Sequence, residues 1–171
     1  MSNVFVISDT HFFHKNILEF EKEARPFSSV EEMNETLVDN WNRVVGHKDV
    51  VWHLGDVLFG KDNFYILDRL NGRKNLVLGN HDHYGAGISS YTEKFRDVQA
   101  SKKLDDFILT HIPVHTCQFG RYEGNIHGHL HSKVVMDHAG WGSDRRYVCV
   151  CVEQTNLAPV AWDCVKQKFG V

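Results

Sequence analysis

Short apolar runs divide the chain, and most of them are followed directly by polar residues or glycine. Apolar runs bounded by turn residues are typical of buried strands. The pattern predicts strands at residues 4–8, 49–54, 75–78, 107–110, 125–127, 147–152 and 160–162. Strands that alternate with helical segments favour a layered α/β fold.

Two segments show helical spacing instead. In residues 28–46 apolar side chains recur at spacings of three and four, which predicts a helix with one buried face. Ser29 and Glu32 form a capping-box signature at its start, and Gly46 is a plausible end. A second helix is predicted at residues 63–70. Loops are predicted at residues 83–93, 116–124 and 137–145.

Composition narrows the possible classes of protein. With 171 residues, 42% of them hydrophobic, the chain fits a single domain spanning residues 1–171. A net charge of -3 gives no sign of a nucleic-acid binder held by phosphate contacts alone, although nucleic acid is not excluded as a substrate. The first residues lack the pattern of a signal peptide, so we expect none, and no apolar stretch is long enough to cross a membrane.

The cysteines point to a reducing compartment, so we expect a cytoplasmic protein. Cys149 and Cys151 are two positions apart in a valine-rich run, and both should face the same side of a strand. Half of a zinc site is one interpretation, but no second cysteine pair completes it. Reduced, partly buried thiols are the interpretation that we adopt.

Histidine, aspartate and asparagine gather where predicted strands end. In layered α/β folds ligands bind beyond the carboxyl ends of strands, so these residues could converge on one site. Imidazole mixed with carboxylate oxygen suits manganese, iron or zinc better than an all-oxygen calcium or magnesium cage. Each cluster alone has a simpler interpretation as a turn, but together they predict a metal site. The clusters are Asp9-Thr10-His11, Gly55-Asp56, Gly79-Asn80-His81-Asp82, His111 and Gly128-His129-Leu130-His131.

This order of motifs resembles the calcineurin-like metallophosphoesterases, in particular the compact stand-alone members of bacteria and phages. The resemblance implies a four-layer α/β/β/α sandwich of two mixed sheets flanked by helices. It also implies two divalent ions, with manganese as the first choice and iron, zinc, nickel or magnesium as alternatives. The first ion would be held by Asp9, His11, Asp56 and His131. The second would be held by Asp56, Asn80, His111 and His129, so that Asp56 bridges the two.

The resemblance implies a hydrolase of phosphoesters, with a hydroxide bound between the two metals as the nucleophile. Two divalent ions outweigh the two carboxylates, so the site would attract an anion. The Asp-Arg-Gly that follows Gly-Asp in protein phosphatases is absent after Asp56, and Asp82 stands where those enzymes have glutamate. We therefore expect a phosphodiesterase acting on small or nucleotide-type substrates. A phosphomonoesterase and a non-catalytic metal-binding scaffold are the alternatives, and oligomeric state is left open.

Four further residues have roles outside the metal set. The resemblance places His81 beside the substrate phosphoryl group, as the acid that protonates the leaving group or stabilises the transition state. Asp82 is expected to orient His81. Arg25 is a candidate phosphate contact because arginine can bind phosphate through two bonds; a solvated surface residue is the alternative. His53 is a candidate substrate contact, or else orients a ligand or is simply structural.

Overall fold

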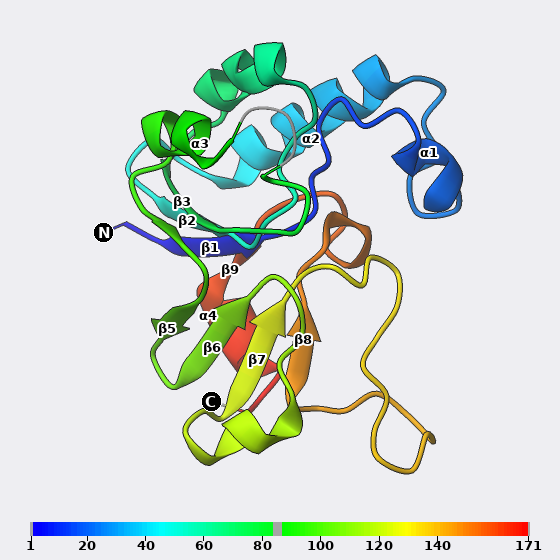
Figure 1. Ribbon diagram of the computed structural model, residues 1–171, viewed down its shortest axis with the longest axis vertical. Helices are drawn as coiled ribbons and strands as arrows, with labels where there is room; N and C mark the ends of the chain where they lie inside the picture. The colour runs from blue at the N-terminus through cyan, green and yellow to red at the C-terminus, as the bar shows by residue number, and fades with distance from the viewer. Residues whose placement is uncertain (1, 84–86, 171) are drawn as a thin grey trace.

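Two mixed sheets form the framework of the molecule, as the computed structural model shows for residues 2–83 and 87–170 (Figure 1). The first sheet has the strand order β4-β3-β2-β1-β9 and the second has the order β5-β6-β7-β8. In the first sheet the strands are β1 Val4–Ile7, β2 Val50–His53, β3 Arg73–Val77, β4 Val98–Gln99 and β9 Val160–Ala161. In the second they are β5 Lys102–Leu104, β6 Phe107–Thr110, β7 Gly124–His127 and β8 Tyr147–Cys149.

Helices flank the sheets, which confirms the predicted α/β class with two mixed sheets (Figure 1). The α-helices are α1 Ile17–Phe20, α2 Val30–Val44, α3 Ile88–Lys94 and α4 Trp162–Gln167. The 3-10 helices are η1 Lys61–Arg69, η2 Thr116–Gly120 and η3 Val152–Gln154. Among the described residues, no helix is both long and apolar enough to span a bilayer.

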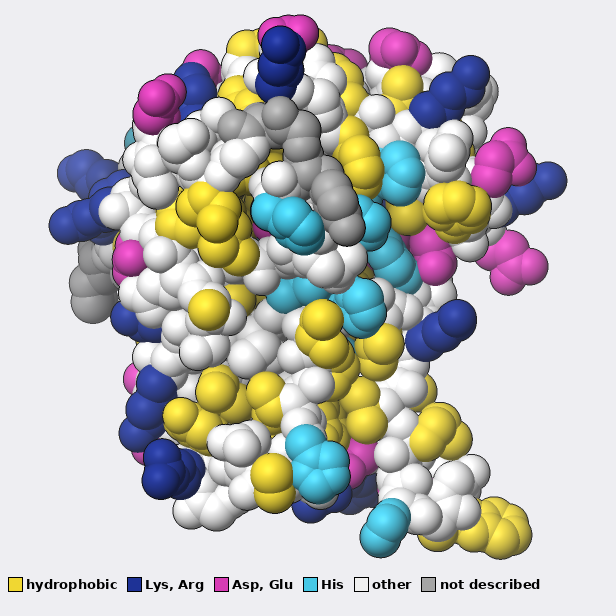
Figure 2. Space-filling view, in the orientation of Figure 1, with side chains coloured by type: hydrophobic (Ala, Val, Ile, Leu, Met, Phe, Trp, Pro, Cys, Tyr) yellow, Lys and Arg dark blue, Asp and Glu magenta, His cyan; other side chains and the backbone are white. Residues whose placement is uncertain are grey.

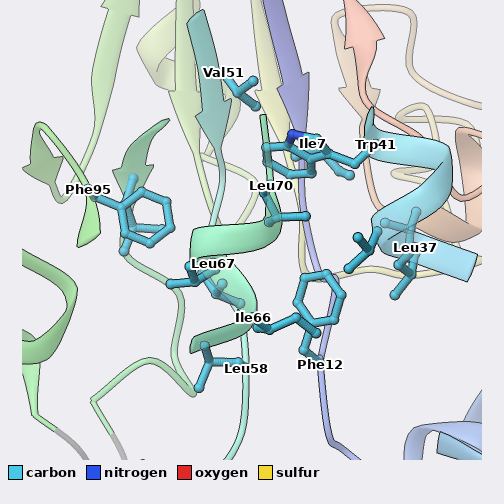
Figure 3. Packing of buried hydrophobic residues seen from close by; sticks show 14 of the residues in the cluster. Ile7, Phe12, Leu37, Trp41, Val51, Leu58, Ile66, Leu67, Leu70 and Phe95 are labelled. Atoms are coloured by element: carbon cyan, nitrogen blue, oxygen red, sulfur yellow. The ribbon is translucent and has the colours of Figure 1, made fainter. Parts of the chain in front are cut away.

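Two apolar clusters hold the layers together. In the first, side chains from α2 and η1, such as Leu37 and Leu67, pack against Ile7 of β1 (Figure 3). The second lies between the sheets, where Val6 and Leu109 are completely buried. Trp162 of α4 belongs to this second cluster and meets the ring of Phe107 edge-on. Both faces of the first sheet are therefore covered, which explains why its strands read as continuous apolar runs.

The register of the strands brings the polar clusters to one edge. The parallel strands β1 and β2 end together, with Ile7 opposite His53. In the second sheet β6, β7 and β8 are also parallel, and Thr110 lies opposite His127. A single parallel bridge between Ser8 and Cys151 joins the two sheets just beyond β1 and β8. The carboxyl ends of strands from both sheets therefore meet at one place.

Several boundaries differ from the sequence prediction. Residues 88–94 form α3, which overlaps the predicted loop 83–93, because Tyr91 supplies a buried contact to the core; residues 84–86 lie outside the described part. The helix predicted at 63–70 is a 3-10 helix, η1. The strand predicted at 147–152 ends at Cys149, and η3 begins at Val152. The capping box is present, with Ser29 Oγ accepting from the backbone N–H of Glu32 at 3.1 Å.

Candidate metal centre

The predicted ligands sit in strained backbone conformations. Five of them have left-handed φ values, namely Asp9 at 57°, His11 at 49°, Asp56 at 55°, His129 at 69° and His131 at 52°. Residues other than glycine adopt this region at a cost of about 1–2 kcal/mol each. Strain of this kind clusters at functional sites, where the surrounding structure enforces it. The turns that follow the strands therefore adopt backbone conformations that orient the predicted ligands, at a cost in conformational energy.

Two glycines in the motifs make room for carboxylates. A Cβ at Gly79 would lie 2.2 Å from Asp56 Oδ1, and one at Gly128 would lie 2.3 Å from Asp9 Oδ2. No side chain fits at such distances without moving the carboxylate. The glycine of each motif is therefore required by the approach of a carboxylate from a different loop.

Asp9, His11 and His131 form one donor group. Asp9 Oδ1 lies 3.6 Å from His11 Nε2 and 3.6 Å from His131 Nε2. Within the described chain, Asp9 Oδ1 and His11 Nε2 are buried and have no hydrogen-bond partner. A buried carboxylate oxygen and a buried imidazole nitrogen without partners are costly, and a cation between them would satisfy both.

Asp56, Asn80 and His111 form the adjacent group. Asp56 Oδ2 lies 3.3 Å from His111 Nε2 and 3.7 Å from His11 Nε2, so it faces both groups. His111 Nε2 donates to Asn80 Oδ1 at 2.8 Å, and the His129 ring centroid is 5.1 Å from that of His111. The imidazoles gather on one face of the molecule (Figure 2).

The carboxylates of Asp9 and Asp56 act on the pKa of His111, an imidazole of this cluster. Burial alone would lower the pKa of His111, but its hydrogen bond to Asp56 and the charge of Asp9 raise it to about 9. The proton on His111 Nε2 therefore stands where a cation would bind. Burial also opposes the charge of Asp9, yet the neighbouring histidines, His11 first, hold its pKa far below the usual range.

These residues fit divalent metal ions. The ligand atoms of Asp9, His11 and His131 lie within 4.8 Å of one another, and so do those of Asp9, Asp56 and His111. Mixed imidazole and carboxylate donors suit a divalent transition ion. All seven predicted ligands thus belong to one cluster, and their assignment to individual ions stays a prediction.

The sequence profile of the calcineurin-like phosphoesterases matches residues 2–162. The chain belongs to the calcineurin-like phosphoesterase family. It is therefore a metal-dependent hydrolase of phosphoesters, and its Asp and His groups could bind the metal.

The phosphoesterase is similar to compact proteins from archaea, phages and bacteria. An uncharacterised protein of Methanocaldococcus jannaschii is 37% identical over 169 residues, covering 96% of this chain and 90% of the relative. The gene 66 protein of Mycobacterium phage L5 is 33% identical over 170 residues, covering 80% and 81%. A crystal structure of a protein of unknown function from Aquifex aeolicus matches with a TM-score of 0.76 at 25% identity, covering 98% and 99%. The predicted resemblance to calcineurin-like phosphoesterases, with relatives in a phage and a bacterium, is confirmed.

Three donors hold the second oxygen of Asp9 in the phosphoesterase. Asp9 Oδ2 accepts from Ser8 Oγ at 2.5 Å, from the backbone N–H of His129 at 2.9 Å and from the Cys151 thiol at 3.2 Å. The Cys149 and Cys151 sulfurs lie 3.3 Å apart, which agrees with the predicted shared face. Because Oδ2 is fully engaged, Oδ1 is the oxygen left to bind a metal.

Arg25 does not occupy the place that the sequence suggested. Its side chain is buried, and it bonds to Glu153 Oε1 through Nε at 2.7 Å and through a terminal nitrogen at 2.6 Å. The same group donates to the backbone oxygens of Asp9 at 2.6 Å and Thr10 at 3.0 Å. Both predicted roles, phosphate contact and solvated surface residue, are wrong because these bonds occupy the guanidinium inside the protein.

Glu153 is the functional residue that the motif search missed. Its Oε1 accepts from His131 Nδ1 at 2.9 Å as well as from Arg25. The signal was present, because Glu153 directly follows the apolar run of residues 147–152, as the predicted ligands follow their strands. An acidic residue after a strand that lacks histidine neighbours did not stand out.

His53 is a structural residue, and its predicted substrate contact is wrong. The side chain is buried, with Nδ1 accepting from the backbone N–H of Gly55 at 3.1 Å. Nε2 therefore carries the proton and donates to Thr10 Oγ1, whose hydroxyl donates to the carbonyl of Val57. Burial lowers the pKa of His53 to about 3, which keeps it neutral in this role.

Asp82 holds backbone, and its predicted role in orienting His81 stays a prediction. Its carboxylate is buried and accepts from the backbone N–H groups of Asp56, Val57 and Gly79, at 3.0, 2.9 and 2.7 Å. These bonds tie the Gly55-Asp56 loop to the Gly79-Asn80 loop. Asp82 thus sets where two predicted ligands lie, without touching the reacting atoms.

His81 lies at the open side of the cluster. Its side chain is 39% exposed, and Nε2 is 3.9 Å from Asp56 Oδ2. Its backbone N–H donates to Asp56 Oδ1 at 2.8 Å, so this bond does not involve the imidazole. An exposed imidazole next to the predicted bridging carboxylate is well placed to meet a substrate.

An aromatic wall, made of His14, Phe20 and Phe59, borders the site and was also missed. The rings of His14 and Phe59 stack at 4.0 Å, and Phe59 is 5.5 Å from the His81 ring. His14 Nδ1 contacts His11 Nδ1 at 3.2 Å. Phe20 is 69% exposed and meets His14 edge-on. One side of the site is therefore suited to a planar apolar group.

Proposed function

We propose that this phosphoesterase hydrolyses phosphodiesters, with small or nucleotide-type substrates, through a site for two divalent ions. The observation that carries the proposal is the position of Asp56 Oδ2. This one oxygen lies 3.7 Å from His11 Nε2 and 3.3 Å from His111 Nε2. A carboxylate oxygen between imidazoles of two donor groups is the arrangement that a bridging ligand needs.

The proposed ligands divide between two ions, of which manganese is our first choice. Asp9, His11 and His131 would hold one ion, and Asn80, His111 and His129 the other, with Asp56 common to both. When bound, two divalent ions lower the pKa of a water and stabilise the charge that develops on phosphorus-bound oxygens. The buried, strained carboxylates keep the ligand atoms fixed before any ion arrives.

His81 is the proposed group that meets the leaving oxygen. Its side chain is 39% exposed beside Asp56, and its backbone is tied to the Asp56 carboxylate. Donation of a proton or a hydrogen bond to the departing oxygen would neutralise its charge as the bond to phosphorus breaks. Buried His53 and Arg25 offer no such group, since their polar atoms are bonded within the protein.

The aromatic wall supports an aryl or nucleotide substrate. Phe59 and His14 stack beside His11, and Phe20 extends this surface toward solvent. A base or aryl ring can stack there while the phosphodiester reaches the metal site, and such stacking contributes about 1–3 kcal/mol per base. A diester with groups on both sides of phosphorus fits a site that is open at His81.

The test compares esters on protein that has been stripped with a chelator and reloaded with manganese. We expect faster cleavage of a bis-aryl phosphate than of the mono-aryl phosphate, and a higher KM for a dialkyl phosphate than for the aryl diester. Protein stripped of metal should be inactive, and manganese analysis should give two ions per chain. A preference for the monoester would make the protein a phosphomonoesterase, and a single ion in fully active protein would refute the two-ion site.

A further inference from the structure

We infer that Glu153 and Arg25 make the Asp9, His11 and His131 group the tighter of the two metal sites. The ionised carboxylate of Glu153, held by Arg25, would accept a hydrogen bond from the imidazole N–H of His131. Glu153 is thus assigned as a positioning residue that acts through His131. The inference rests on the proposed two-ion site and adds an order of metal affinity to it.

The contacts behind His131 are ionic and sealed from water. The side chains of Arg25 and Glu153 are both 0% exposed. Glu153 Oε1 accepts a hydrogen bond from His131 Nδ1 at 2.9 Å and two bonds from the Arg25 guanidinium, at 2.7 and 2.6 Å. The guanidinium of Arg25 is always charged, and its two bonds to Oε1 pair it with an ionised carboxylate behind the imidazole.

Arg25 couples this carboxylate to the opposite ligand loop. It lies 128 positions from Glu153 in sequence, yet it bonds to Glu153 and to the backbone oxygen of Asp9. The Ser8–Cys151 bridge brings the same two segments together at the junction of the sheets. One guanidinium thus fixes the distance between the Asp9 loop and the acceptor of His131.

In the other donor group, His111 has a weaker acceptor behind its imidazole. His111 Nδ1 donates to the backbone oxygen of Leu54 at 2.8 Å, which is a neutral acceptor. A carboxylate behind a ligating histidine makes the imidazole a better donor to metal, and loss of such a partner typically costs about 10–100-fold in metal affinity. Since the described residues place a carboxylate behind His131 but only a carbonyl behind His111, the His131 site should fill first.

The experiment measures manganese binding, by electron paramagnetic resonance of free ion, in chelator-stripped protein. Wild type should bind two ions in separable steps. Glu153→Gln keeps the shape of the side chain and removes its charge, so the tighter step should weaken by about 10–100-fold. The manganese affinity of the weaker step should change much less. Glu123→Gln, at an exposed position, is the matched control and should leave both steps unchanged.

A double-mutant cycle ties the effect to His131. In a His131→Ala background, where the imidazole is gone, Glu153→Gln should have no further effect on binding. Glu153→Asp should restore part of the affinity that Glu153→Gln loses. Circular dichroism of the metal-free variants checks that each is folded, and a variant that fails this check is replaced by Arg25→Lys, which is expected to weaken the same step.

The outcomes separate this inference from the proposed function. Two ions bound by wild type, with Glu153→Gln leaving both steps unchanged or weakening both equally, would overturn the positioning role alone. An effect of Glu153→Gln that persists without His131 would also overturn it. A single ion bound by wild type would remove the two-ion proposal itself.

Discussion

Two buried carboxylates outside the predicted ligand set, Glu153 and Asp82, support the two donor groups of the site in different ways. The group of Asp9, His11 and His131 is called the Asp9 half, and the group of Asp56, Asn80 and His111 the Asp56 half. Glu153 contacts ionisable side chains, the imidazole of His131 and the guanidinium of Arg25. Asp82 accepts hydrogen bonds from three backbone N–H groups, those of Asp56, Val57 and Gly79, and bonds to the Tyr91 side chain as well. Glu153 makes the imidazole of His131 a better donor to metal. Asp82 fixes the positions of the Gly55-Asp56 and Gly79-Asn80 loops.

The difference follows from where the ligands come from. The Asp9 half joins segments from both sheets, and side chains must reach across the junction to connect them. In the Asp56 half, Asp56 and Asn80 come from the loops after β2 and β3, which are neighbours in one sheet, so the backbone groups of these two loops are already close. His111 reaches this half from the end of β6 in the second sheet. We therefore expect Glu153 to govern metal affinity and Asp82 to govern stability, and the following changes test that division.

Asp56→Asn should have the largest effect, because Asp56 belongs to both halves. Its Oδ2 faces His11 of one group and His111 of the other. Loss of this charge should weaken both ions and lower kcat by more than about 100-fold, beyond the usual cost of a residue that only supports a ligand. Steady-state kinetics and manganese analysis on the same preparation would show it. Retention of one fully occupied ion would mean that Asp56 serves a single metal.

His81→Ala should lower kcat by about 10²–10⁴-fold while both ions remain. The imidazole lies outside the two donor groups, and the bond that ties residue 81 to Asp56 comes from its backbone N–H, which alanine keeps. Metal content measured beside kcat separates the two roles. If manganese is lost together with activity, His81 is a ligand and the division into two halves is incomplete.

Asp82→Asn should mainly lower stability. The amide offers one acceptor oxygen in place of two, which leaves at least one buried backbone N–H without a partner at a cost of about 1–3 kcal/mol. Urea denaturation of metal-free protein measures this, with Asp106→Asn, at an exposed position, as the control that should stay within about 0.5 kcal/mol. If stability is unchanged and activity is lost, the result would instead support the predicted role of Asp82 in catalysis, where it orients His81.

The sequence placed the candidate ligands at the ends of predicted strands, and the structure brings those ends together. Asp9, Asp56 and His111 each follow an apolar run; parallel pairing of β1 and β2 aligns the first two, and His111 meets them from the end of β6 in the second sheet. The pattern could not reveal which polar side chains turn inward. Arg25 looked like a surface residue before a helix, and only its partner Glu153, 128 positions away, explains its burial.

The strained turns were also beyond the sequence pattern. Asp9 and His11 have positive φ, which their residue types permit but do not require. The helix α3 was missed for a similar reason, since its buried residue Tyr91 packs on Phe64 of η1, a contact between separate segments. Local pattern thus predicts elements and candidate ligands, whereas long-range contacts decide which residues support them.

Cys151→Val gives the smallest expected effect and tests how much each hydrogen-bond donor contributes to holding Asp9 in place. The Cys151 thiol is one of three donors to Asp9 Oδ2, beside Ser8 Oγ and the His129 N–H. Valine fills the space without donating, and the two remaining bonds still orient the carboxylate. Manganese affinity of the tighter step should fall about two- to threefold, the lower end of a net hydrogen bond of ~0.5–1.5 kcal/mol.

Cys151→Ser is the matched control, because a hydroxyl restores a donor at the same position and should keep the wild-type affinity. A loss in Cys151→Val as large as that in Glu153→Gln would show that the orientation of Asp9, rather than the charge behind His131, controls the first site. Equal loss in the serine and valine variants would show that the size of sulfur matters and the thiol proton does not. A small loss confined to valine fits a half-site in which several weak donors hold Asp9 and one ionic pair holds His131.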